Sequence, residues 1–183
     1  MNKAKKHVVV FAGNECSMEK ESYYYSVAYD TGKLLASSGY VTVTGGGPGL
    51  MNEVCRGAVE NGGETYGICL TVAGRIHSKY LTRQELFHHL NPRQERLLNI
   101  GDAFIAIPGG IGTHYEVFAV VSLKRKLDIP VAKPMILVDG FFNPFEQLME
   151  HIYKNGFAAM DVKKLYTIVK NPAEAIEILS KIL

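Results

Sequence analysis

The chain is poor in cysteine, with only Cys16, Cys55 and Cys69 among its residues. Their number is odd, they lie far apart, and none forms a Cys-x-x-Cys pair, which argues against a disulfide framework and against a cysteine-based zinc site. Of the six histidines only His88 and His89 are adjacent. Adjacent residues on a strand point to opposite faces and cannot share a metal ion. We therefore expect no metal site.

The chain also lacks a large excess of charge of one sign and long hydrophobic runs. The formal net charge is +2, and the basic cluster at residues 3–6 stands near the start of the chain, where a solvated tail explains it. Nucleic acid is therefore a poor candidate partner. The apolar run at residues 8–12 is too short for a signal peptide, and no run approaches membrane-spanning length. We expect a cytoplasmic protein that binds neither nucleic acid nor membrane.

What the chain does contain is typical of a globular protein. It has 183 residues, of which 47% are hydrophobic and 21% charged, without a low-complexity tract. This length fits one compact domain that spans residues 1–183 and buries a substantial core. No composition shift or linker divides it.

Apolar strands alternate with amphipathic helices along the sequence. The pattern predicts strands at residues 8–12, 40–44, 65–70, 85–90, 103–107, 135–138 and 166–169. It predicts helices at residues 18–38, 50–61, 91–100, 113–125 and 145–155, and a last helix that begins near residue 172. The expected fold is therefore α/β: a single-domain, Rossmann-like, doubly wound and mostly parallel sheet with helices on both faces.

Two of these helices carry the same start signal. Asn91-Pro92 and Asn171-Pro172 each place a capping residue before a proline, with Gln94 or Glu174 at the capping-box position. The pattern predicts that Asn91 and Asn171 are the N-caps of their helices.

Two glycine-rich turns, at residues 45–49 and 108–112, each follow an apolar strand and open a helix. Such a turn lets phosphate oxygens approach backbone N–H groups, and the helix dipole favours the anion. Glycine also serves in tight turns that bind nothing. Two such turns in one domain favour the phosphate interpretation, because both fall at the carboxyl ends of strands, where α/β sheets bind their ligands.

Two nucleotide-binding motifs are missing from the glycine-rich turns, and their absence restricts the class of nucleotide that the turns could bind. Leu50 stands where a dinucleotide fingerprint would have its third glycine, and no Gly-Lys-Ser/Thr sequence supplies the lysine and magnesium ligand of a triphosphatase. A nucleoside monophosphate is therefore the favoured ligand.

Charged side chains near the turns have two interpretations. Glu116 lies three residues after Thr113, so it fits both a capping box and a catalytic carboxylate, and the spacing leaves both open. Arg93 and Arg96 are three residues apart, which by itself suggests a solvated helix face. His114 lies at the same turn, where it can simply face solvent.

Three segments together resemble a known family: Gly45-Gly46-Gly47-Pro48-Gly49-Leu50-Met51, Arg93, and Pro108-Gly109-Gly110-Ile111-Gly112-Thr113-His114-Tyr115-Glu116. They are similar to the Lonely Guy family of cytokinin-activating phosphoribohydrolases, whose members are often labelled lysine decarboxylases. The similarity spans most of the chain and includes residues 8–13, 102–106 and 138–142. The second glycine turn, with its glutamate, is the most specific part.

The resemblance implies a homodimer that needs no cofactor. It would cleave AMP or an N6-modified AMP, a nucleoside 5′-monophosphate, into free base and ribose 5-phosphate. By position, Arg93 would be the catalytic arginine and Glu116 the catalytic glutamate. The phosphate and ribose would be held by Gly46, Gly47, Gly109, Gly110, Gly112 and Thr113.

The chain departs from the family pattern in one place. Cytokinin-acting members carry Met-His-x-Arg-Lys, whereas this chain has Leu90-Asn91-Pro92-Arg93-Gln94, which keeps the arginine and loses the histidine and lysine. Base specificity is therefore open. The alternative function is a non-catalytic nucleotide or molybdenum-cofactor carrier on the same fold. Retention of both Arg93 and Glu116 favours the enzyme.

Overall fold

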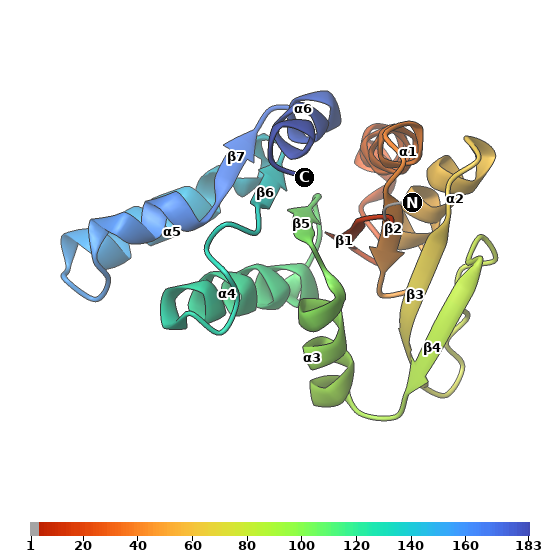
Figure 1. Cartoon of the computed structure of the whole chain (residues 1–183), viewed down its shortest axis with the longest axis horizontal. Helices are drawn as coiled ribbons and strands as arrows, with labels where there is room; N and C mark the ends of the chain where they lie inside the picture. The colour runs from red at the N-terminus through yellow and green to blue at the C-terminus, as the bar shows by residue number, and fades with distance from the viewer. Residues whose placement is uncertain (1–3) are drawn as a thin grey trace.

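A seven-stranded sheet, in which every paired strand runs parallel to its neighbour, forms the centre of the computed structural model, which describes residues 4–183. Its strands are β1 (His7–Phe11), β2 (Val41–Thr44), β3 (Thr65–Leu70), β4 (Arg83–Phe87), β5 (Ala103–Ala106), β6 (Met135–Val138) and β7 (Thr167–Val169). They lie in the order β4-β3-β2-β1-β5-β6-β7 (Figure 1). The chain builds outward from β1 to β4, then returns to place β5 on the other side of β1.

Helices cover both faces of this sheet (Figure 1). One face packs against α1 (Glu21–Ser37), α2 (Leu50–Glu60) and α6 (Pro172–Ile182). The other packs against α3 (Leu90–Ile100), α4 (Ile111–Lys126) and α5 (Asn143–Lys154). Short 3-10 helices form at η1 (Met18–Lys20), η2 (Gly140–Phe142) and η3 (Met160–Leu165).

The central strands are apolar on both sides because both sides are covered. In β1, Val8 and Val10 belong to the core under α1 and α2, while Val9 and Phe11 belong to the opposite core. Such continuous burial is typical of parallel strands between two helical layers. The predicted α/β, doubly wound fold is confirmed.

The two predicted asparagine caps have different outcomes. At α6 the cap is confirmed: the Glu174 backbone N–H donates to the Asn171 side chain at 3.0 Å. At α3 the prediction was wrong, because the helix begins at Leu90 and its N-cap is His89, without a side-chain cap bond. Pro92 is the third residue of α3. The first backbone N–H groups of a helix have no partner within the helix, so a proline, which lacks the N–H, is tolerated there and does not mark the first residue of the helix.

Two other expectations need correction. The strand predicted at residues 85–90 is β4, at Arg83–Phe87, an edge strand whose side chains are mostly exposed and so carry a weak apolar signal. The basic cluster is not only a solvated tail, since Lys5 forms an ion pair with Glu64 and Lys6 with Asp102. Lys3, its first residue, lies outside the described residues. In residues 4–183, no helix has the length and apolar character needed to cross a membrane.

Helices α1 and α2 approach each other closely at two glycines. A Cβ at Gly32 would lie 1.9 Å from the Val54 carbonyl oxygen, and one at Gly57 would lie 2.0 Å from the Tyr29 carbonyl oxygen. Both neighbours are backbone atoms, which cannot rotate away. The two helices therefore pack at a distance that only glycine permits.

Replacing Gly32 with alanine tests this close packing. Although alanine favours a helix over glycine by about 1 kcal/mol, Gly32→Ala should lower the melting temperature, because overpacking costs about 1–3 kcal/mol and the backbone contact at this position is severe. The matched control is Gly112→Ala in α4, where a Cβ would meet no atom of the described chain within 4 Å. Thermal unfolding measures both variants. A melting temperature for Gly32→Ala at or above that of the wild type would contradict the packing.

Candidate functional site

A cleft of about 340 Å³ opens at the carboxyl end of the sheet. Its lining comes from β1 and the loop after it, from the loops after β2 and β3, and from the first turns of α2, α3 and α4. It lies where the strand order reverses between β1 and β5, the position at which open α/β sheets bind ligands. The two glycine turns reach this region from opposite sides of β1.

The second glycine turn supplies open space and backbone donors. Gly110, Gly112 and Thr113 line the cleft, and a Cβ at either glycine would meet no atom of residues 4–183 within 4 Å. Gly109 does not line it: a Cβ there would lie 2.1 Å from Thr113 Oγ1 and 2.8 Å from the Gly13 backbone nitrogen. Gly109 therefore lets the turn pack against the loop after β1, while its two neighbours leave room beside the N-terminus of α4.

The first glycine turn makes room for protein side chains. A Cβ at Gly45 would lie 1.9 Å from the Arg93 Nη2 atom, so the glycine admits the arginine. Gly46 has a positive φ of 66°, and a Cβ there would lie 2.3 Å from the Cys69 sulfur. Gly45 lines the cleft, whereas the predicted Gly46 and Gly47 lie next to the lining. Their role in ligand binding stays a prediction.

Arg93 and Glu116 meet in the cleft from two different helices. The Arg93 Nη1 atom lies 3.5 Å from Glu116 Oε1, and the two side chains are only 11% and 12% exposed. Arg93 Nε also donates to the Ile68 carbonyl at 2.9 Å, which fixes the guanidinium against β3. Arg96 is more exposed and pairs with Glu85 instead. The structure therefore brings together the two residues that the resemblance singled out.

The capping interpretation of Glu116 was wrong. The N-cap of α4 is Gly110, so Thr113 is the third residue of the helix and Glu116 the sixth. Thr113 makes no side-chain cap bond, and the Glu116 carboxylate accepts from Arg93. A carboxylate in the second turn cannot reach the free N–H groups of the helix start.

Burial sets the electrostatics of this pair. It raises the pKa of Glu116 to about 7, and Arg93 keeps that pKa from rising further. Burial also lowers the pKa of Arg93, while Glu116 opposes that change. A carboxyl group that titrates near neutral pH can accept or donate a proton during a reaction.

Arg75 is a lining residue that sequence reasoning missed. It stands between β3 and β4, lines the cleft, and depresses the pKa of Arg93 through like-charge repulsion. Within residues 4–183 Arg75 forms no ion pair. The lining also contains the carboxyl groups of Glu15 and Glu116, and the positive end of the α4 dipole lies at the second turn. No motif marks Arg75 in the sequence.

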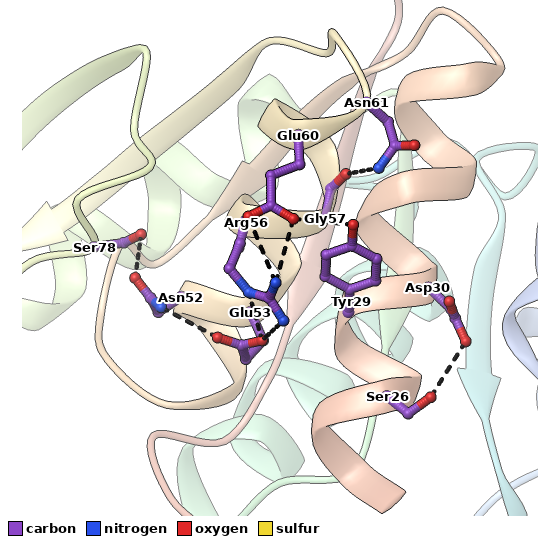
Figure 2. Close-up of polar contacts among 10 residues, drawn as sticks. All are labelled: Ser26, Tyr29, Asp30, Asn52, Glu53, Arg56, Gly57, Glu60, Asn61 and Ser78. Carbon is purple, nitrogen blue, oxygen red and sulfur yellow. Dashed lines mark hydrogen bonds and ion pairs between the residues drawn. The ribbon is translucent and has the colours of Figure 1, made fainter. Parts of the chain in front are cut away.

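Hydrogen bonds hold the loop that carries Arg75. The Ser78 backbone N–H donates to the Gly46 carbonyl at 2.9 Å, and its hydroxyl donates to the Asn52 side chain at 2.9 Å. Figure 2 shows Ser78 at α2, where Asn52 donates in turn to Glu53. The loop is thus tied to both the first glycine turn and the helix that follows it.

His114 has a local role. Its ring lies 5.8 Å from those of Phe141 and Phe142, its Nδ1 atom is 3.0 Å from the Gly110 carbonyl, and it does not line the cleft. In the part of the chain that the structure describes, no three His, Cys, Asp or Glu side chains are grouped to hold a metal.

Comparison with known proteins identifies relatives across the chain. The family model described as "Possible lysine decarboxylase" matches residues 51–179. A probable cytokinin riboside 5′-monophosphate phosphoribohydrolase of Oryza sativa subsp. japonica is 30% identical, with 94% of this chain and 71% of that protein covered. A cytokinin riboside 5′-monophosphate phosphoribohydrolase of Rhodococcoides fascians is 29% identical, with 93% and 87% covered.

Among solved structures, the fold is similar to the molybdenum cofactor binding protein of Rippkaea orientalis. The TM-score is 0.74 at 23% identity, and 99% of each chain is covered. At this identity the likeness concerns the fold.

The pKa of Glu116 can be measured directly. Its carboxyl carbon, followed by 13C NMR, should titrate with a midpoint of about 7, well above the ordinary value of 4.5. Arg93→Gln should move the midpoint higher, because the guanidinium favours the carboxylate. Arg96→Gln, on the outer side of the same helix, should leave it unchanged. A midpoint near 4.5 in the wild type would contradict the buried environment.

Proposed function

Because this chain belongs to the Lonely Guy family, we propose that it hydrolyses the N-glycosidic bond of a nucleoside 5′-monophosphate, releasing free base and ribose 5-phosphate. AMP or an N6-modified AMP is the proposed substrate. The observation that carries the proposal is the buried Arg93–Glu116 pair, which lies in one cleft with the N-terminus of α4.

The phosphate binds at the second glycine turn in this proposal. Gly110 and Gly112 leave the N-terminus of α4 open, and Thr113 adds a hydroxyl to the backbone N–H groups there. Arg75 adds a cation that has no ion-pair partner within residues 4–183. The cleft volume of about 340 Å³ lies at the small end of ligand pockets, about 300–1,000 Å³, and suits a mononucleotide better than a dinucleotide.

Glu116 acts at the sugar. Cleavage of an N-glycosidic bond develops positive charge on the anomeric carbon and ring oxygen, which a nearby carboxylate stabilises. The same carboxylate takes a proton from the attacking water, whose oxygen bonds to the anomeric carbon as the base departs with the bond's electron pair. A pKa of about 7 suits this proton transfer near neutral pH.

Arg93 positions the substrate. Its Nε–H is used by the Ile68 carbonyl and its Nη1 group by Glu116, which leaves the remaining N–H groups of the planar guanidinium to bind phosphate, ribose or the leaving base. It also holds Glu116 in place and favours its charged form.

A lysine decarboxylase activity is not proposed, despite the description of the family model. Pyridoxal chemistry needs a lysine that forms a Schiff base with the cofactor. Within residues 4–183 the cleft lining contains no lysine, so its residues do not fit that cofactor.

A homodimer is part of the proposal. Leu90, Ile111 and Tyr115, on the first turns of α3 and α4, are 48%, 91% and 46% exposed beside the cleft. Apolar side chains gathered at such a surface favour contact with a second protein chain. A second copy would cover them and narrow the cleft entrance.

The test of the proposed function is incubation with AMP and detection of free adenine and ribose 5-phosphate. The catalytic efficiency on AMP should exceed that on adenosine at least about tenfold, because phosphate binding orients the reacting centre.

The charge of Glu116 gives a second prediction. Below pH 7 the rate of AMP hydrolysis should fall as Glu116, with its pKa raised to about 7, becomes protonated and loses its charge. Glu116→Gln should lower base release at least about 100-fold and still bind AMP. AMP binding by the wild type without base release would favour the carrier alternative.

Arg93 and Arg96 offer a matched pair of variants. Arg93→Lys keeps the charge and loses the planar fork, so catalytic efficiency on AMP should fall at least about tenfold. Arg96→Lys, at an exposed ion pair on the same helix, should change it less than about twofold. Steady-state kinetics measures both. Small, equal effects would remove Arg93 from the site.

A further inference from the structure

A second pocket lies at the opposite end of the sheet. It has a volume of about 150 Å³ and is formed where β6 and β7 begin, beside the last turn of α4, the end of η3 and the C-terminal half of α6. Its lining includes the aliphatic side chains of Met135, Leu165 and Ile178. Among residues 4–183, the only charged residues that line it are Lys124 and Lys164, so this part of the chain gives the lining positive charge alone.

Lys124 is the unusual member of this lining. It is 2% exposed, and its amino group donates to the Leu165 carbonyl at 2.7 Å. No carboxylate of residues 4–183 lies within 4.0 Å of that amino group. Burial lowers the pKa of Lys124 to about 8, so the group still carries most of its positive charge at pH 7. A buried charge without a counter-charge is costly unless an anion joins it.

Capping of η3 explains only part of this arrangement. Leu165 is the last residue of η3, and a lysine near a helix end commonly satisfies such a carbonyl. An ammonium group has three N–H donors, and the carbonyl uses one. Lys133 makes a similar bond to the Gly101 carbonyl, at 2.6 Å, but remains partly exposed, so water can reach its other donors. Lys124 lacks that exposure.

We propose that this pocket binds a small aliphatic monocarboxylate, whose carboxylate pairs with Lys124 and whose hydrocarbon part lies against Met135, Leu165 and Ile178. The volume of about 150 Å³ corresponds to about five water volumes, which suits a branched acid of about five to seven non-hydrogen atoms. The exposed Lys164 adds positive charge at the edge. The site is separate from the cleft, because it lies at the amino ends of the strands.

Isovalerate and its uncharged amide test the proposal on the whole protein. Titration followed by 15N–1H NMR should show saturable shifts at Met135, Leu165 and Ile178 with isovalerate. Isovaleramide, which has the same shape and no charge, should bind at least tenfold more weakly. Lys124→Met should weaken isovalerate binding at least tenfold, whereas Lys133→Met, the matched lysine outside the pocket, should change it less than twofold.

Several outcomes would overturn the proposal. Equal affinity for acid and amide would show that Lys124 does not recognise charge. Unchanged isovalerate binding by Lys124→Met would show the same. Shifts confined to Gly110, Gly112 and Thr113 would place the acid at the N-terminus of α4 instead, and an absence of shifts would leave Lys124 as a cap of η3 alone. If Lys124→Met does not fold, as judged by circular dichroism, the acid and amide comparison in the wild type decides.

Discussion

The buried contact between Arg93 and Glu116 is the constraint around which the cleft is arranged. It joins α3 to α4 across the end of the sheet, with both side chains almost removed from water. Removing two charges from water commonly costs as much as their attraction returns, so such a pair is weak evidence for stability. The surrounding structure nevertheless accommodates it: Gly45 has no side chain where the guanidinium lies, and the Ile68 carbonyl binds it. The free-energy cost of burying this ion pair is explained if the pair acts in catalysis.

The topology explains why these groups converge. The sheet grows away from β1 on both sides, so the loops after β1 and β5 separate at the strand ends and leave a space between them. The second glycine turn enters that space directly from β5. Its opening helix contributes both backbone donors at its start and Glu116 one turn later. One segment thereby places the free backbone N–H groups of a helix start and a buried carboxylate in the same cleft.

Periodicity predicted the sheet and its helices because burial on two faces leaves a strong apolar signal. The signal failed where burial is partial, as in the edge strand β4, and where a local motif has more than one solution, as at Asn91. The motif pattern predicted Arg93 and Glu116, but only the structure removes the capping interpretation of Glu116. Arg75 could not be predicted from the residues around it, because its position in the cleft depends on the contact between Ser78 and Asn52, far apart in the sequence.

The burial of residues 90–94 and their places relative to the cleft explain how the chain accommodates its departure from the family pattern. Asn91 and Pro92 are exposed and lie outside the cleft, while Leu90 and Arg93 line it. Gln94 is 4% exposed, and neither its amide nitrogen nor its oxygen has a hydrogen-bond partner within residues 4–183. The missing lysine is thus replaced by a neutral side chain inside the protein, which avoids a second buried cation next to Arg93. If the proposed function holds, Leu90 and Arg93 are the residues of this segment that lie where they can contact a ligand in the cleft.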